Sequence, residues 1–100
     1  MEFLKEFGYL DDDIKEIIDS NYPNIIDNLN LNKNNVMLII NYLLEIGIQK
    51  DAIKEIFMYQ VGLFFKTINE IKTSFDEYEL DSIIKSLNYD VNNIELIDFV

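Results

Sequence analysis

Apolar residues recur at intervals of three and four along nearly the whole chain, and this spacing limits the folds open to it. Ile14, Ile17 and Ile18 give one example. Such spacing places apolar side chains on one face of an α-helix, whereas a half-buried strand alternates them. We therefore expect an all-α fold, with seven or eight short helices packed as successive helical hairpins in one domain of residues 1–100. The helical pattern covers residues 3–7, 11–18, 23–29, 36–46, 50–59, 61–72 and 76–87.

Glycine, proline and asparagine mark the breaks between these segments. Gly8 and Gly47 each follow an apolar segment, where a glycine commonly ends a helix in the left-handed conformation. Pro23 suits the first turn of a helix, because the N–H group that proline lacks has no partner there. Asparagine competes for backbone hydrogen bonds, so the asparagine-rich residues 28–35 predict a connector. Residues 94–100 fit either a helix or a strand.

The sequence repeats itself with an offset of 39 residues. Phe-Leu-Lys-Glu-Phe-Gly-Tyr (residues 3–9) aligns with Tyr-Leu-Leu-Glu-Ile-Gly-Ile (residues 42–48), and the Ile-Lys-Glu-Ile segments that follow keep the same offset. A weaker third copy starts at Ile84. Recurrence at about 40 residues is typical of stacked helical hairpins. We therefore expect two to three such repeats.

This pattern resembles the repeat of mitochondrial transcription termination factor (mTERF-type) proteins, in which a helix ends in Leu-Gly and a capped second helix follows. The matching pairs here are Phe7-Gly8 and Ile46-Gly47, and Pro23 stands where the family has a proline-containing short helix. The second copy has Gly62 where that proline would be expected. The resemblance implies stacked helical hairpins. It also implies nucleic-acid binding, from which this acidic chain departs.

The charge of the chain and its missing residue types exclude several classes of function. There are 19 acidic residues and 8 lysines, for a net charge of −11, and there is no histidine, cysteine or arginine. The chain therefore lacks the usual zinc ligands, disulfides and histidine-activated nucleophiles. We expect a protein that is not an enzyme, with no cofactor, no metal and no catalytic residue.

No segment has the composition of a membrane span or a signal peptide. The longest apolar run, residues 36–40, is much shorter than the ~20 residues needed to cross a bilayer. Glu2 and Glu6 interrupt the apolar stretch that a signal peptide would require. We expect no membrane association and a cytoplasmic location.

Two clusters of carboxylates lie near predicted helix starts. They are Asp11, Asp12, Asp13 and Glu16 in the first cluster, and Asp76, Glu77, Glu79 and Asp81 in the second. Acidic side chains at a helix start cap its N–H groups and complement the helix macrodipole. The first cluster lacks the alternating Asp spacing of a calcium loop, and the second flanks an apolar face without interrupting it. We interpret both as exposed acidic surface that would contact a basic partner protein.

Residues 58–65 form an apolar run that contains more large side chains than one helix face can bury. Two interpretations remain open for it. The run is either the core of a tight hairpin or the seam of a homodimer or partner groove. In the second case the interface residues would be Met58, Tyr59, Leu63 and Phe64.

Together these features predict a small acidic interaction module that binds a basic partner protein. One use of such a surface is to occupy the nucleic-acid-binding surface of that partner, as phage and plasmid inhibitors such as anti-CRISPR proteins do. The alternative is an mTERF-like repeat protein that binds nucleic acid itself. A net charge of −11 opposes that alternative, because binding a duplex requires clustered cations that neutralise phosphates.

Overall fold

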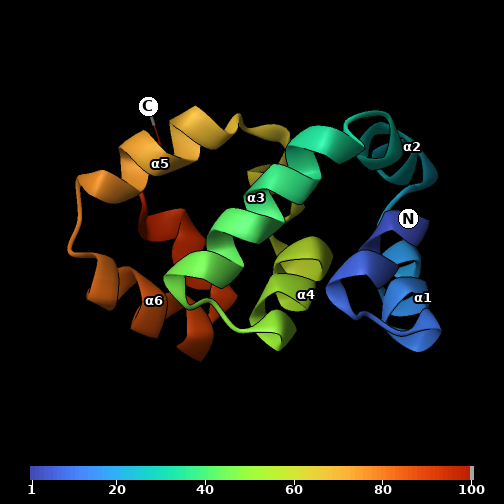
Figure 1. Cartoon of the computed structure of the whole chain (residues 1–100), viewed down its shortest axis with the longest axis horizontal. Helices are drawn as coiled ribbons and strands as arrows, with labels where there is room; N and C mark the ends of the chain where they lie inside the picture. The colour runs from blue at the N-terminus through green and yellow to red at the C-terminus, as the bar shows by residue number, and fades with distance from the viewer. Residues whose placement is uncertain (100) are drawn as a thin grey trace.

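In a computed structural model, which describes residues 1–99, the chain consists of short helices throughout, as the spacing of apolar residues predicts (Figure 1). Within these residues there is no strand. The six α-helices are α1 (Asp11–Asp19), α2 (Pro23–Leu31), α3 (Lys33–Ile46), α4 (Lys50–Tyr59), α5 (Ile68–Asp76) and α6 (Leu80–Tyr89). Three 3₁₀ helices accompany them: η1 (Glu2–Phe7), η2 (Val61–Phe65) and η3 (Val91–Leu96).

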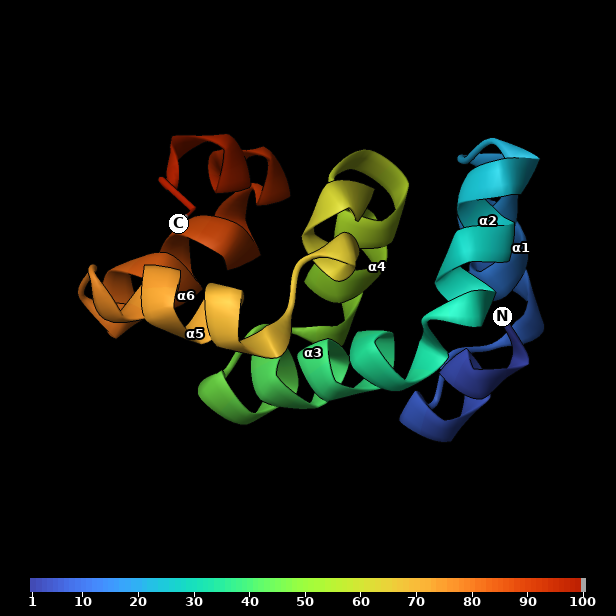
Figure 2. The ribbon, with the colours of Figure 1, turned by 90° about the horizontal axis from the view of Figure 1, so that it is seen from above.

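The helices α1, α4 and η3 form a row, and α3 runs along one side of this row (Figure 2). Contacts between α1 and α4 join start to start and end to end, so these two helices are parallel. At the start, the Tyr9 hydroxyl donates to the Lys50 carbonyl oxygen at 2.7 Å. At the end, the Asn21 amide donates to the Phe57 carbonyl oxygen at 3.0 Å.

The core lies between this row and α3. Val36, Ile39, Ile40 and Leu43 of α3 are fully buried, so this helix supplies much of the core. Aromatic side chains complete the core, and the rings of Phe57 and Phe64 stack with 3.9 Å between centroids. The other fully buried large side chains include Leu4, Ile17, Leu29, Ile53, Ile56 and Phe75.

Two turns with the same geometry recur at the predicted offset of 39 residues. Gly8 has φ 85° and Gly47 has φ 111°, so both adopt the left-handed conformation expected of a glycine that ends a helix. After Gly47, the Ile48 N–H donates to the Leu43 carbonyl oxygen at 2.9 Å, and Tyr9 makes the equivalent bond to Leu4 after Gly8. The first two copies therefore share a Schellman-type turn.

The third copy differs from the first two at the end of its first helix. Within residues 1–99 no non-glycine residue has positive φ, so α6 does not end in such a turn. The side chain of Asn88 contacts the second copy by donating to the Gly47 carbonyl oxygen at 3.1 Å. It also accepts from the Gln49 N–H at 2.8 Å.

Several predicted boundaries are wrong. Residues 28–35 are not a connector, because α2 and α3 run through them and only Asn32 separates the two helices. Residues 61–72 are not one helix, since η2 ends at Phe65 and Thr67 caps α5 by accepting from the Glu70 N–H. The choice between helix and strand was open for residues 94–100: the chain is helical from Val91 to Leu96 and extended at Ile97, and Val100 lies outside the described residues.

No helix within residues 1–99 is long and apolar enough to cross a bilayer.

Candidate functional site

The parallel pairing of α1 with α4 leaves an open groove of about 400 Å³ between them. Its lining consists of Glu16, Asp51, Lys54, Glu55, Met58 and Tyr59. Tyr59 is 60% exposed, so its ring is available to a ligand. The α1–α4 groove therefore combines three carboxylates, one ammonium group and an apolar edge.

Lys54 is already engaged inside this groove. Its Nζ lies 2.9 Å from Asp13 Oδ1 and 3.1 Å from Glu16 Oε2, and its side chain is only 17% exposed. These carboxylates raise the pKa of Lys54 through their hydrogen bonds and charges, so it stays protonated. Asp51 and Glu55, by contrast, form no ion pair within residues 1–99. The groove thus keeps negative charge that its own lysine does not neutralise.

The internal repeat places carboxylates at equivalent positions on the two helices. Asp12 and Glu16 on α1 occupy the same repeat positions as Asp51 and Glu55 on α4, since each pair is separated by 39 residues. Packed helices place their axes about 8–10 Å apart, so equivalent positions on parallel neighbours form adjacent rows. Asp51 and Glu55 are absent from the sequence-based clusters, although the repeat gave the signal that could have identified them.

Asp13 accepts hydrogen bonds both from the start of α1 and from the groove lysine, Lys54. Leu10 is the N-cap residue, not one of the aspartates, and its N–H donates to Asp13 Oδ2 at 3.0 Å. This hydrogen bond, followed by the one from Lys54, lowers the pKa of the Asp13 carboxyl below its ordinary value of 3.8. Asp11 pairs with Lys5 at 3.0 Å, and Asp12 is exposed. In the first acidic cluster, lysines therefore pair with Asp11, Asp13 and Glu16, whereas Asp12 is exposed to solvent.

Asp13→Asn is expected to destabilise the protein at neutral pH but not in acid. A carboxyl with a lowered pKa in the folded state contributes stability above its ordinary pKa of 3.8 and loses it as the pH falls through the lowered value. Urea unfolding at about pH 7 and about pH 2 measures the difference. The matched control, Asp12→Asn, removes the same charge from an exposed neighbour and should have little effect at either pH. An equal loss for Asp13→Asn at both values would contradict the assignment.

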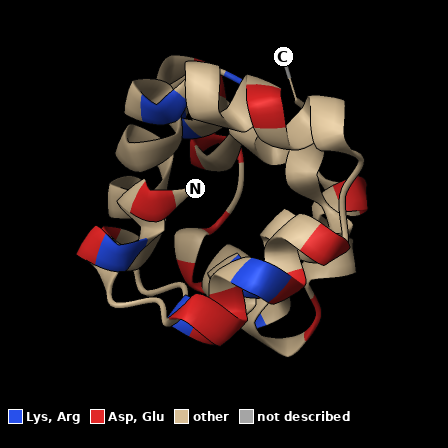
Figure 3. Ribbon diagram, turned by 90° about the vertical axis from the view of Figure 1, so that its right-hand side faces the viewer, with Lys and Arg blue, Asp and Glu red and all other residues tan. Residues whose placement is uncertain are grey.

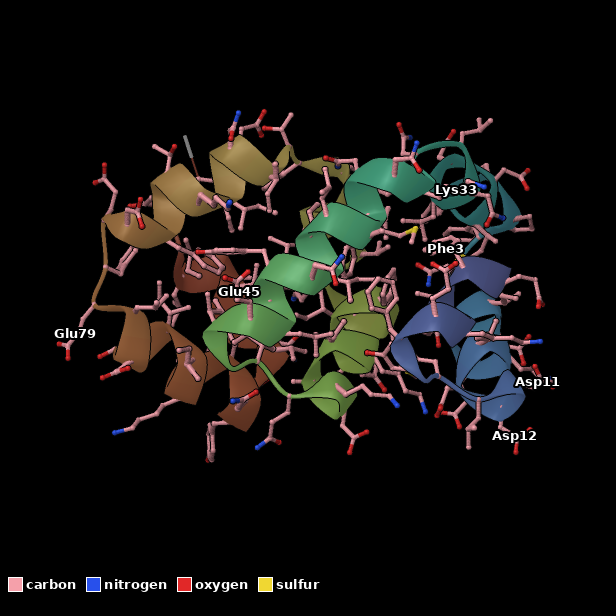
Figure 4. All side chains as sticks on the ribbon, viewed as in Figure 1. Phe3, Asp11, Asp12, Lys33, Glu45 and Glu79 are labelled. Carbon is pink, nitrogen blue, oxygen red and sulfur yellow. The ribbon has the colours of Figure 1, made fainter. Side chains whose placement is uncertain are left out.

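The second acidic cluster surrounds the turn between α5 and α6. Asp76 is the last residue of α5 and Glu77 follows it, so the prediction that these two residues begin a helix is wrong. Glu79 is the N-cap residue of α6 and Asp81 lies in its first turn. Glu79 of this cluster lies at the opposite end of the molecule from Asp11 and Asp12, as their labels show in Figure 4. The structure does not bring the two clusters together.

Carboxylates are distributed around the molecule and do not converge on one face. Figure 3 shows the N-terminal end, where Asp and Glu occur on all sides of the ribbon. Within residues 1–99, no three of them are placed to hold a metal ion together. The α1–α4 groove is therefore a local concentration of charge on a generally acidic surface.

The apolar run of residues 58–65 divides into an exposed part and a buried part. Met58 and Tyr59 line the α1–α4 groove. Leu63 and Phe64 are buried, so of the two open interpretations the tight hairpin applies to them. The stacking of Phe64 on Phe57 accounts for this burial, because η2 folds back against α4.

No protein-family model matches the chain, and no curated protein or solved structure is significantly similar to it.

Proposed function

We propose that the protein is a non-enzymatic interaction module whose α1–α4 groove binds a lysine- or arginine-bearing segment of a basic partner protein. The observation that carries the proposal is the surplus of carboxylate in the groove. Within residues 1–99, Asp51 and Glu55 form no ion pair and line the same groove as Tyr59, while the groove's own lysine is held by Asp13 and Glu16.

The groove offers each part of a basic side chain a suitable contact. A lysine ammonium or arginine guanidinium would lie between Asp51 and Glu55, and its methylene groups would cover Met58. The exposed ring of Tyr59 adds a cation–π contact, which is worth about 0.5–1 kcal/mol at an exposed site. The overall charge of −11 would attract such a partner from a distance and accelerate its association.

The partner class that fits best is a protein with a nucleic-acid-binding surface, because such surfaces present lysine and arginine in clusters. The module would then act as an inhibitor that occupies this surface, in the manner of phage and plasmid proteins such as anti-CRISPR proteins. A cytoplasmic location belongs to the same proposal. Added DNA or RNA should therefore compete with the module for its partner.

The contacts of the lysines weigh against the alternative, an mTERF-like protein that binds nucleic acid directly. Lys5, Lys15 and Lys54 pair with carboxylates. Lys66 Nζ lies 4.5 Å from the ring centroid of Phe99, and Lys72 Nζ lies 5.4 Å from that of Tyr42, so both are engaged by aromatic rings. Phosphate binding would need these cations to be free and close together.

A labelled oligoarginine peptide tests the groove through fluorescence anisotropy. The double variant Asp51→Asn/Glu55→Gln should weaken peptide binding roughly tenfold, because two unpaired carboxylates are lost from one site. The matched control is Asp76→Asn/Glu77→Gln, which removes the same charge at the opposite end of the molecule. This control should reduce binding much less.

Salt provides an independent measurement on the same complex. Binding should weaken steeply as salt is added, because the Debye length falls from about 10 Å at 0.1 M to about 3 Å at 1 M. If the two double variants weaken binding equally, net charge alone attracts the peptide and the groove is not the site. Binding that does not depend on salt would also contradict the proposal.

A further inference from the structure

A second groove, of about 340 Å³, lies between α6 and η3, which pack against each other at the C-terminal end of the row (Figure 2). The α6 wall contributes Ser82, Ser86 and Leu87, and the opposite wall contributes Leu96 and Ile97. The short serine side chains leave space between the walls. Leu87 is buried at the base, whereas Leu96 is 75% exposed. This α6–η3 groove is therefore mainly apolar and open to solvent.

Two hydrogen bonds connect the walls of the α6–η3 groove. The Asn93 side-chain amide donates to the Ser86 carbonyl oxygen at 2.9 Å. The Asp98 N–H donates to the Tyr78 hydroxyl oxygen at 3.1 Å, and Tyr78 also lines the groove. Because these bonds join α6 and the turn before it to residues on and after η3, the groove is formed before any ligand arrives. Preformed apolar clefts of this size are typical binding sites.

The surroundings of the groove are acidic. Residues 76–99 contain seven Asp and Glu but only one lysine, Lys85. Glu79 lines the groove itself, and Glu95 precedes the exposed Leu96. A second copy of this chain that inserted its own Leu96 would bring Glu95 toward Glu79. Like charges close together disfavour that arrangement, whereas lysine or arginine at the same positions would be attracted.

We propose that the α6–η3 groove binds an amphipathic helix of a partner protein, with leucine-like side chains in the groove and lysine or arginine on the flanks. Amphipathic helices commonly dock an apolar face into such grooves. The cost of exposing Leu96 to water falls when a partner covers it. This site is separate from the α1–α4 groove, so either proposal can fail without the other.

A synthetic helical peptide with leucine at positions i, i+3, i+4 and i+7 and lysine elsewhere is the probe. Titration against the full chain should show binding. Two variants, Ser82→Trp to fill the groove and Leu96→Asn to remove its apolar wall, should each weaken binding roughly tenfold. The matched control is Leu31→Asn, because Leu31 is 82% exposed at the end of α2, away from the groove. It should bind the peptide as the unchanged chain does.

Circular dichroism confirms that each variant is folded before binding is compared. A peptide in which glutamate replaces lysine should fail to bind, and one in which asparagine replaces leucine should bind much more weakly. Three results would overturn the proposal: equal weakening by Leu31→Asn, undiminished binding by both groove variants, or light scattering that shows a dimer broken by Leu96→Asn.

Discussion

Phe57→Ala is expected to lower the free energy of unfolding by about 3–5 kcal/mol, the usual cost of truncating a buried phenylalanine. Phe57 has no solvent exposure, and its ring stacks on Phe64 with an interplanar angle of 9°. Truncation would leave a cavity where η2 packs on α4. Since a domain of this size is stable by about 5–15 kcal/mol, urea unfolding should show a large fall in the midpoint.

The matched control for this prediction lies two residues further along the same helix. Tyr59→Ala also removes an aromatic ring, but Tyr59 is 60% exposed, so the expected change is within about 1 kcal/mol. Equal effects of Phe57→Ala and Tyr59→Ala would show that the packing of η2 on α4 does not stabilise the fold.

Gly47→Ala is expected to destabilise the protein by about 1–2 kcal/mol, because an L-residue is strained in the left-handed conformation. Gly47 has φ 111°, while a β-carbon there would meet only Ile84 at an ordinary 3.6 Å. The cost therefore comes from the backbone and not from a clash. Thermal unfolding followed by circular dichroism would measure it.

Gly62→Ala is the control for the backbone effect. Gly62 lies outside the positive-φ region, and nothing would lie within 4 Å of an added β-carbon. Alanine should be neutral there or slightly stabilising, because it reduces the freedom of the unfolded chain. If Gly47→Ala left the stability unchanged and Gly62→Ala lowered it, the left-handed conformation assigned to Gly47 would be contradicted.

Much of the fold follows from periodicity because burial dominates helix formation in a chain of this kind. The predicted residues 50–59 match α4 (Lys50–Tyr59), where the buried Ile53, Ile56 and Phe57 lie on one face. The prediction of a connector at residues 28–35 is wrong because the low helix propensity of asparagine is a weak preference, which packing overrides. Leu29 and Val36 are fully buried on either side of Asn32, and their burial keeps both helices intact.

The break inside residues 61–72 had a local signal of its own. Thr67 and Glu70 have the spacing of a capping box, and the Thr67 side chain accepts from the Glu70 N–H at 3.1 Å. The apolar spacing continues across this point, so periodicity alone did not separate η2 from α5. The folding of η2 against α4 brings Phe64 onto Phe57, and this reversal of the chain is not encoded by the 3.6-residue period of apolar side chains.

The candidate site was predictable in part. Glu16, Met58 and Tyr59 belong to sequence-based groups, but their meeting in one groove depends on the parallel packing of α1 and α4. Composition predicts an acidic surface without specifying which carboxylates stay unpaired. That distinction depends on the position of Lys54, whose partners Asp13 and Glu16 lie on another helix.

The glycine turns also link the copies of the repeat. The Gly8 carbonyl oxygen accepts from the Lys50 ammonium at 2.6 Å, and the Gly47 carbonyl oxygen accepts from Asn88. Each turn thus ends one helix and anchors the following copy. Transient opening at Gly47 would consequently release α6 as well, and native-state hydrogen exchange should find the amides of both regions losing protection together.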